Sequence, residues 1–424
     1  TTFRMTQGSL KGLEMNNLII HNARILTPLG TTAVKGKDMS NLFEIPNGTV
    51  EITDGIITYV GANRSFIPEG YHIMNAEGRV LLPGFIDSHT HLVFGGYRPE
   101  EFMWRMKGDS YMSIMERGGG IINTVRATRE TSTDDLIAKA EWYIDIMSQM
   151  GVTTVEGKSG YGLDKETELK QLEVMKAING KPNRKVDIAT TFLGAHAVPT
   201  EYKGREEEYI DFLIEEMLPI VKERELAEHC DIFCEKGVFT VEQSRRLLQA
   251  AKDMGFGVKI HADEIVSFGG AELAGELQAL SADHLLHASD AGIQAMAANN
   301  VVATLLPLTA FTLREPYARG REMIDQGCAV ALATDLNPGS CCSGSIPLTF
   351  ALACIYMHFS IEEAITAMTL NGAAAIGRAE TIGSIEVGKQ GDLVILDAET
   401  PAILPYYTGM NAVRHTIKRG KILN

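Results

Sequence analysis

Short apolar runs alternate with longer amphipathic segments along the middle of the chain, and this rhythm is typical of successive strand–helix units. One amphipathic segment, 133–150, begins with a Thr-Asp-Asp sequence and is followed by Gly151, which are start and stop signals for a helix. Eight such units over about 300 residues predict a (β/α)8 barrel of the TIM type. The eight predicted strands lie at 85–89, 152–156, 187–193, 231–234, 256–261, 281–284, 301–306 and 329–335.

An open, doubly wound sheet is the alternative arrangement of alternating strands and helices. A dinucleotide-binding sheet of that kind carries a GxGxxG sequence after its first strand, and no such sequence follows the first strand of this chain. The barrel is therefore the favoured architecture.

The two ends of the chain have a different pattern from the middle. Residues 16–80 and 383–424 contain short alternating apolar runs divided by Gly and Asn, which predicts strands without helices between them. We expect both ends to build one small β-sandwich domain. The predicted fold class is thus α/β, with a barrel at 84–380, a composite β-sandwich at 16–83 and 381–424, and a tail at 1–15.

The charge balance narrows the class of partner. The chain has 54 acidic and 39 basic residues and a net charge of −15, which disfavours nucleic acid. The net charge does not exclude an anionic small molecule as substrate. A few arginines beside the site would attract it at short range, where they outweigh the overall negative field. No run approaches the ~18 consecutive apolar residues of a membrane span, and the first residues lack the apolar stretch of a signal peptide. We expect a small-molecule substrate, with neither nucleic acid nor a membrane as partner.

The six cysteines are too few for a disulfide scaffold and include no CxxC pair. We therefore expect reduced thiols and a cytoplasmic protein. A symmetric homodimer is the expected assembly for a protein of this kind.

The first candidate site residues lie where the first barrel strand ends. His89 and His91 close this strand, and residues i and i+2 of a strand point to the same face, so both imidazoles can bind one metal ion. Barrel enzymes place their sites at the carboxyl ends of strands. Elsewhere in a chain, two incidental histidines would be the simpler interpretation; at this position metal binding is favoured.

Further candidates end other strands: His196 follows the third, His261 ends the fifth, His284 the sixth and Asp335 the eighth. A lone histidine is usually structural, but five of eleven histidines at strand ends are hard to attribute to coincidence. Imidazole nitrogens with one carboxylate, and without thiolates, suit Zn²⁺ or iron. Such a set leaves a position for water, whose pKa the metal lowers. Glu264 lies three residues after His261 and can act as a proton shuttle, so these residues predict metal-assisted hydrolysis.

Several longer motifs surround these residues, and together they resemble the amidohydrolase superfamily. They are GFIDSHTH at 84–91, HLVFGG at 91–96, KSGYGL at 158–163, GAHA at 194–197, KIHADE at 259–264, ATDLNPGS at 333–340 and GKQGDLV at 388–394. The His-x-His sequence alone would identify only the superfamily. The whole set is similar to members that hydrolyse an imidazolone ring bearing a propionate, and it covers nearly all of the chain from residue 16 onward. Residues 1–15 have no counterpart, and Cys341 and Cys342 place two thiols next to the predicted pocket.

The resemblance implies a ligand set and a substrate. One Zn²⁺ or Fe ion per chain would be bound by His89, His91, His261 and Asp335. The substrate would be 4-imidazolone-5-propanoate, held by Arg98, Tyr161 and His196 with Glu264 beside its ring, and Asn337, Gly339 and Ser340 would bind the carboxylate of the product, N-formimidoyl-L-glutamate.

The expected mechanism is attack of a metal-bound hydroxide on the ring amide carbonyl. His284 and the metal would stabilise the developing oxyanion. Asp335 or Glu264 would move the water proton to the departing ring nitrogen, and the sequence leaves the choice between them open.

Three alternatives to this function are distinguishable from the residues. Another cyclic-amide hydrolase or deaminase of the superfamily would share the metal ligands but differ at Arg98, Tyr161 and His196. A non-catalytic scaffold would be expected to have lost ligands, and this chain keeps all four. A binuclear hydrolase would need a bridging group such as a modified lysine on the fourth strand. Lys236 lies near the end of that strand, but between Glu235 and a glycine turn, so a single metal ion is favoured.

Overall fold

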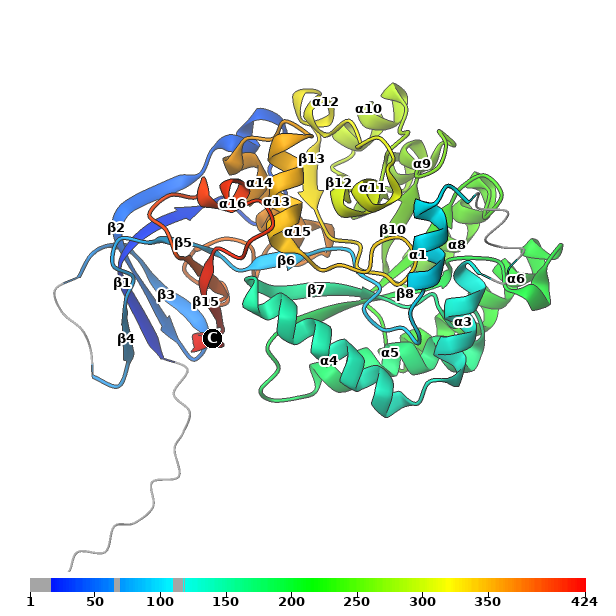
Figure 1. Ribbon diagram of the computed structural model, residues 1–424, viewed down its shortest axis with the longest axis horizontal. Coiled ribbons are helices and arrows are strands. Elements are labelled where there is room, and N and C mark those ends of the chain that lie inside the picture. Colours follow the sequence, from blue (N-terminus) through cyan, green and yellow to red (C-terminus); the bar gives the residue numbers. More distant parts are fainter. Residues whose placement is uncertain (1–16, 65–68, 110–116, 118) are drawn as a thin grey trace, which may run out of the picture.

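Two β-sheets organise the computed structural model of the chain, which describes residues 17–64, 69–109, 117 and 119–424. Each sheet has eight strands. The strands of one sheet come from the middle of the chain and form a barrel, whereas those of the other come from both ends and lie beside the barrel (Figure 1). The predicted fold class, a (β/α)8 barrel with a small β-domain from both termini, is confirmed.

The barrel strands follow one another around the sheet in chain order, and each paired neighbour is parallel. Nearly all of their residues are buried, because helices cover the outside and side chains fill the inside. They lie at the eight positions that the apolar runs predict. The strands are β6 (Phe85–Asp87), β7 (Val152–Lys158), β8 (Asp187–Ala195), β9 (His229–Cys234), β10 (Gly257–Ala262), β11 (Ser281–His284), β12 (Val302–Leu305) and β13 (Ala329–Leu332).

The barrel closes between β13 and β6, just beyond the ends of these two strands. The N–H of Asp335 donates to the carbonyl oxygen of His89 over 3.0 Å, and the N–H of His91 donates to that of Leu336 over 2.8 Å. Thr90 forms a parallel bridge with Leu336. The closure therefore brings candidate residues from the first and last strands side by side.

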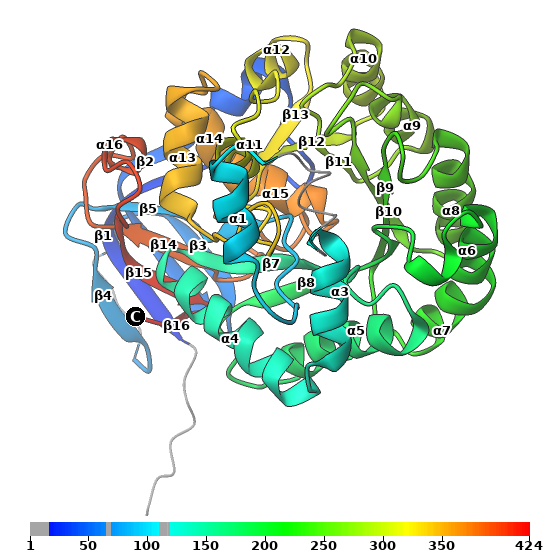
Figure 2. The same ribbon diagram turned by 45° about the vertical axis from the view of Figure 1, so that its right-hand side comes forward.

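Helices surround the barrel strands, as Figure 2 shows. The hydroxyl oxygen of Ser132 accepts a hydrogen bond from the N–H of Asp135 and caps α4, one residue before the Thr-Asp-Asp sequence. None of the helices in the described part of the chain has the length and apolar character that a membrane crossing requires. The helices are α1 (Pro99–Met106), α3 (Ile121–Glu130), α4 (Thr133–Gln149), α5 (Lys165–Asn179), α6 (Glu206–Phe212), α7 (Leu218–Glu223), α8 (Val241–Asp253), α9 (Gly270–Leu277), α10 (Asp290–Ala298), α11 (Pro307–Leu313), α12 (Gly320–Asp325), α13 (Ile346–Ile355), α14 (Ile361–Met368), α15 (Leu370–Ala375) and α16 (Ile403–Tyr406), with shorter helical turns η1 (Gly36–Ser40), η2 (Thr200–Tyr202) and η3 (Leu213–Met217).

Pairing between β5 and β14 joins the two ends of the chain into one sheet. β5 precedes the barrel and β14 follows it, and Leu82 pairs with Val394 in an antiparallel register. The order is β16-β15-β14-β5-β1-β2-β3, and β4 pairs with β1 beside β5. These strands share an apolar core of their own, which includes Ile20, Ile52 and Ile417. They are β1 (Leu18–Thr27), β2 (Phe43–Thr53), β3 (Ile56–Ala62), β4 (His72–Asn75), β5 (Val80–Pro83), β14 (Leu393–Leu396), β15 (Val413–Lys418) and β16 (Lys421–Ile422).

A largely buried ionic group, which we call the junction cluster, fastens this sheet to the barrel; it consists of Lys418, Arg419, Asp187 and Asp392. Lys418 Nζ lies 2.7 Å from Asp392 Oδ2 and 2.8 Å from Asp187 Oδ2, and it donates to the carbonyl oxygen of Thr153 over 2.9 Å. Arg419 Nη2 lies 2.8 Å from the same oxygen of Asp187. Because Asp187 begins β8 and Lys418 ends β15, the cluster holds a barrel strand against the terminal sheet.

Candidate active site

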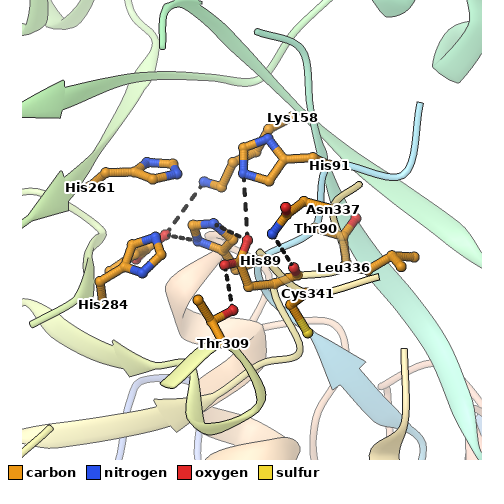
Figure 3. Close-up of polar contacts among 12 residues, drawn as sticks. His89, Thr90, His91, Lys158, His261, His284, Thr309, Leu336, Asn337 and Cys341 are labelled. Atoms are coloured by element: carbon orange, nitrogen blue, oxygen red, sulfur yellow. Dashed lines mark hydrogen bonds and ion pairs between the residues drawn. The ribbon is translucent and has the colours of Figure 1, made fainter. Parts of the chain in front are cut away.

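Four histidines from three barrel strands converge at one end of the barrel (Figure 3). His89 and His91 follow β6, His261 lies in β10, and His284 ends β11. The ring centroid of His89 lies 5.3 Å from that of His91, 4.6 Å from that of His261 and 5.3 Å from that of His284. Asp335 completes the group, since its Oδ1 lies 3.5 Å from His89 Nε2 and 3.7 Å from His91 Nε2.

These side chains have the donors and the spacing of a metal site. Ligand atoms of His89, His91 and His261 all lie within 4.8 Å of one another, as do those of His89, His284 and Asp335. Nε2 of His89 and Nε2 of His261 are buried and have no hydrogen-bond partner among the described residues. An unpartnered buried polar atom costs about 1–3 kcal/mol, so several together indicate a ligand. The residues present therefore fit a metal ion.

Two carboxylates orient the histidines from behind. Asp283 Oδ2 lies 2.6 Å from His89 Nδ1, and Asp231 Oδ2 lies 2.9 Å from His261 Nδ1. The His89 contact is a hydrogen bond that keeps the proton on Nδ1 and leaves the lone pair of Nε2 free for a metal. At His261 the contact is a close pairing with the Asp231 carboxylate. Asp335 is held in a similar way, because the hydroxyl of Thr309 donates to its Oδ2 over 2.6 Å and leaves Oδ1 facing the histidines.

Burial sets the protonation of this group. It lowers the pKa of His89 and His91 well below the usual value, so both imidazoles are neutral, which is the form that binds metal. Burial would also lower the pKa of His261, but Asp231 outweighs it and raises the pKa. Burial raises the pKa of Asp335 to about 6. A nearby cation favours the ionised form of such a carboxyl group.

Behind the histidines lies a fully buried set of charged side chains that we call the site cluster: Glu156, Lys158, Asp231, Lys259 and Asp283. Lys158 Nζ lies 2.7 Å from Asp231 Oδ2, 3.0 Å from Glu156 Oε1 and 3.4 Å from Asp283 Oδ2. Lys259 Nζ lies 3.1 Å from Glu156 Oε2. The spacing of these residues in the sequence predicts no role for them. A signal was present, since charged residues inside buried strands are rare unless they are paired.

The charges of this region also suit a cation. The site cluster sets three carboxylates against two ammonium groups, and Asp335 adds a further carboxylate next to the histidines. Uncompensated charge is costly away from water. A bound divalent cation would neutralise the excess, so the charge and the donor set agree.

Glu264 lies at the edge of the same group, with Oε1 3.6 Å from His284 Nδ1. Burial, with the charge of Asp335 as a further cause, raises the pKa of Glu264 to about 8.

The preceding residue, Asp263, organises the loop after β10, because its carboxylate accepts hydrogen bonds from the N–H groups of Phe268, Gly269 and Ala271. His284 and Asp335 have φ of 77° and 55°, an uncommon conformation for such residues that often occurs at functional sites.

Tyr161 and His196 lie beside the histidine group. The His196 ring stacks on that of His91 with centroids 4.8 Å apart, and Tyr161 lies 5.2 Å from His196. The loop that carries Tyr161 needs glycine at 160, where φ is 107° and an added Cβ would lie 2.9 Å from His196. The carboxylate of Glu168 accepts hydrogen bonds from N–H groups of this loop, including that of Gly160. The structure thus brings both predicted residues to the site.

Arg98 lies against the loop that follows β13. An added Cβ on Gly339 would lie 2.5 Å from Arg98 Nη1. Nε and Nη2 of Arg98 donate to one oxygen of Glu101 over 2.8 Å and 2.7 Å, so Glu101 anchors the guanidinium. A second arginine, Arg105 of α1, also contacts this loop, with Nη2 donating to the carbonyl oxygen of Gly339 over 3.5 Å.

The loop residues Asn337, Gly339 and Ser340 are bonded to one another in this conformation. The N–H groups of Gly339 and Ser340 both donate to Asn337 Oδ1 over 2.8 Å. The Asn337 amide donates in turn to the carbonyl oxygen of Asp335. The three residues are therefore together near the site, with their donors directed within the loop.

The cysteines and Lys236 are the remaining residues that the sequence singled out. All six cysteines are free; Cys341 is buried and Cys342 is exposed. Cys342 Sγ lies 3.3 Å from the hydroxyl oxygen of Tyr143. Lys236 is exposed, and its backbone N–H donates to the carboxylate of Glu235. The buried lysines of the site come from β7 and β10 instead.

A sequence profile of the amidohydrolase family matches residues 80–423. The chain belongs to this family of hydrolases. An imidazolonepropionase of Phocaeicola vulgatus is 75% identical over 410 residues, which cover 96% of this chain and 99% of that protein. One of Bacteroides thetaiotaomicron is 70% identical over 410 residues, which cover 96% and 98%. Within the amidohydrolase family, the chain groups with these imidazolonepropionases.

The solved structures that resemble this chain show the same fold at low sequence identity. A 5-methylcytosine deaminase from Klebsiella pneumoniae, liganded with phosphonocytosine, superimposes with a TM-score of 0.70 at 17% identity, over 96% of this chain and 98% of that one. At this identity the likeness concerns the fold alone.

Proposed function

We propose that the chain hydrolyses 4-imidazolone-5-propanoate and opens its ring to give N-formimidoyl-L-glutamate. The observation that carries this proposal is a set of buried imidazole nitrogens near Asp335 that have no hydrogen-bond partner within the described part of the chain, in a protein 75% identical to an imidazolonepropionase. Water adds across the ring amide bond: the carbonyl carbon gains a hydroxyl group, the bond to nitrogen breaks, and the nitrogen gains a proton.

The proposed metal site consists of His89, His91, His261 and Asp335. One zinc or iron ion per chain suits these nitrogen and oxygen donors. When bound, such an ion polarises a carbonyl group and lowers the pKa of a bound water. The carboxylates of Asp283 and Asp231 keep the Nε2 atoms of His89 and His261 directed toward it.

On this proposal, Arg98, Tyr161 and His196 bind the substrate. Arg98 offers a planar guanidinium to a carboxylate, and Glu101 keeps the guanidinium beside the β13 loop. The stacking of His196 on His91 sets the distance between the bound ring and the metal ligands. These contacts favour an anionic heterocycle over a neutral one.

Glu264 and His284 serve the reacting atoms. His284 stabilises the oxyanion that forms at the ring carbonyl. Glu264 or Asp335 accepts the water proton and returns it to the departing nitrogen. Glu264 is the better candidate for this transfer, because Asp335 accepts a hydrogen bond from Thr309 and faces the metal ligands. Glu264 accepts the proton in its ionised form, which a nearby cation favours over the protonated form that burial favours.

The product carboxylate has a defined place in the proposal. Asn337 Oδ1 accepts the N–H groups of Gly339 and Ser340. A carboxylate oxygen of the product would accept the same two N–H groups in place of Asn337 Oδ1, and the side-chain amide of Asn337 would be a further donor to it.

The remaining expectations belong to this proposal as well. The protein acts on a small molecule, without nucleic acid, as a symmetric homodimer. The six free cysteines support a reducing compartment such as the cytoplasm.

A spectrophotometric assay of metal-analysed protein tests the function. We expect turnover of 4-imidazolone-5-propanoate and none of dihydroorotate or guanine. A full metal complement without turnover of the imidazolone would contradict the proposed substrate and leave the family chemistry in place.

The Glu264→Gln variant tests the proton transfer. We expect kcat to fall by about 10²–10⁴-fold, with the metal content unchanged. Glu276→Gln is the matched control, because Glu276 is exposed and pairs with Arg245 on the surface. Near-full turnover by Glu264→Gln would assign the transfer to Asp335.

A further inference from the structure

The ammonium group of Lys158 sits inside a cage of three carboxylates. Its Nζ lies within 3.4 Å of Asp231, Glu156 and Asp283, and all four side chains have no exposed surface. Burial would lower the pKa of Lys158, but the three carboxylates outweigh it and raise the pKa above its usual value. The three carboxylates therefore favour the charged form of Lys158.

The walls of this cage have the donors of a metal site in their own right. Ligand atoms of His89, Glu156 and Asp283 lie within 4.8 Å of one another. Glu156 Oε2 is buried and has no hydrogen-bond partner among the described residues, although Lys259 Nζ lies 3.1 Å away. The cage thus places carboxylate oxygens of three residues around the Lys158 ammonium, and Lys259 adds a second positive charge at its edge.

The cage is also continuous with the proposed metal ligands. Asp231 Oδ2 lies 2.7 Å from Lys158 Nζ and 2.9 Å from His261 Nδ1. Asp283 Oδ2 lies 3.4 Å from Lys158 Nζ and 2.6 Å from His89 Nδ1. One oxygen of each carboxylate is therefore shared between the ammonium group and an imidazole.

We propose that Lys158 is a built-in cation that occupies a second cation position, and that it thereby limits the site to one metal ion. The inference rests on the proposed binding of a metal by His89, His91, His261 and Asp335. The ammonium balances the carboxylates that would otherwise attract a second divalent ion, and it fills their shared space. It also keeps Asp231 and Asp283 in place behind the histidines.

Lys259 does not have this role. Its Nζ donates to the carbonyl oxygens of Ala375 and Ser88 over 3.0 Å and 3.4 Å, and lies 3.9 Å from Asp283 Oδ2. Backbone contacts hold Lys259 at the edge of the cage, so it contributes charge without filling the centre.

Metal stoichiometry tests the proposal. Purified full-length protein is equilibrated with Zn²⁺ and separately with Co²⁺, dialysed, and analysed for metal per chain. We expect one ion in the unchanged protein and in Lys158→Arg, which keeps the cation. Lys158→Ala removes the charge and opens the space, and it should hold two ions. Lys158→Met removes the charge but fills the space, and it should hold one.

The control is Lys418→Ala, which opens a similar cage in the junction cluster, where no histidine is present; its metal content should stay at one ion. Circular dichroism confirms that each variant is folded. A folded Lys158→Ala with one ion, bound as tightly as in the unchanged protein, would overturn the proposal. So would a second buried ion in the unchanged protein, a result that needs no variant to fold. An unchanged protein that binds no metal would instead contradict the proposed function.

Discussion

The site cluster and the junction cluster both pair a buried lysine with carboxylates, but the further contacts of the two clusters differ. In each, a buried lysine ammonium lies within 3.0 Å of two carboxylates, Asp231 and Glu156 for Lys158 and Asp392 and Asp187 for Lys418. The junction cluster closes on itself through Arg419 and a backbone carbonyl. The site cluster instead leads to histidine nitrogens that have no partner among the described residues.

This contrast indicates which buried charges point to function. Burying an ion pair is costly and adds little net stability, even when the geometry is good. The junction cluster is explained by its position, because it joins a barrel strand to a strand of the terminal sheet. The site cluster lies within the barrel, where β7, β9, β10 and β11 are also held by backbone pairing, and through Asp231 and Asp283 it contacts His261 and His89. Its carboxylates are explained by the histidines that they orient.

The largest effect is expected at Asp335, a proposed metal ligand that lies outside the site cluster. Asp335→Asn removes a negative ligand, so both metal and activity should be lost. We expect kcat/KM to fall by at least ~10²–10³-fold, the loss typical of removing one group at a reacting centre. Metal analysis beside the kinetic assay checks this. An intact metal content would refute the ligand role of Asp335.

Lys418→Met breaks the junction cluster and should act on stability alone. Removing one partner of a buried ion pair costs about 3–5 kcal/mol, so the free energy of unfolding in urea should fall by that amount. Metal affinity and kcat should stay unchanged. A change in metal affinity would contradict the separation of the two clusters.

Asp231→Asn weakens the site cluster and should act on the metal. A carboxylate behind a metal-binding histidine is worth about 10–100-fold in metal affinity, and we expect a loss of that size in a competition titration with a chelator. Asp392→Asn in the junction cluster is the matched control and should leave the metal affinity unchanged. Equal losses of metal affinity in the two variants would show that the site cluster supports the metal no more than the junction cluster does.

Acid should weaken the junction cluster in a defined pH range. Burial alone would raise the pKa of Asp187, but Lys418 and Arg419 outweigh it and lower the pKa from 3.8 to about 2. The group binds fewer protons in the folded state, so its stabilisation is fully present above pH 3.8 and is lost as the pH falls toward 2. We expect a loss of about 2 kcal/mol across this range.

Urea unfolding at several pH values below 5 checks this dependence. In Lys418→Met the pKa of Asp187 lies closer to its ordinary value, so the slope of unfolding free energy against pH should be smaller. An unchanged slope would assign the acid sensitivity to other carboxyl groups.

Much of the barrel could be predicted because its strands have a local signature. Each is a short apolar run before an amphipathic helix, and the eight runs match β6 to β13. The positions of His89, His91 and His261 followed from the rule that strand ends meet at one face. A β-domain from both termini was also predictable, since both ends lack helical patterning.

The site cluster could not be predicted in the same way, because its contacts join distant strands. Lys158 meets Asp231 and Asp283 only after β7, β9 and β11 have taken their places in the barrel. The motifs around Lys158 and Lys259 were recognised, but nothing in their spacing identified the partners. The internal bonding of Asn337 was equally hidden, since side-chain direction within a loop depends on its fold.

Metal removal is the decisive test of whether the histidine group and the site cluster form a metal-dependent hydrolytic site. Protein treated with a chelator and shown to be folded and metal-free should lose turnover of 4-imidazolone-5-propanoate, and added Zn²⁺ or Fe²⁺ should restore it as about one ion binds per chain. Metal-free protein that keeps the full rate would contradict the account.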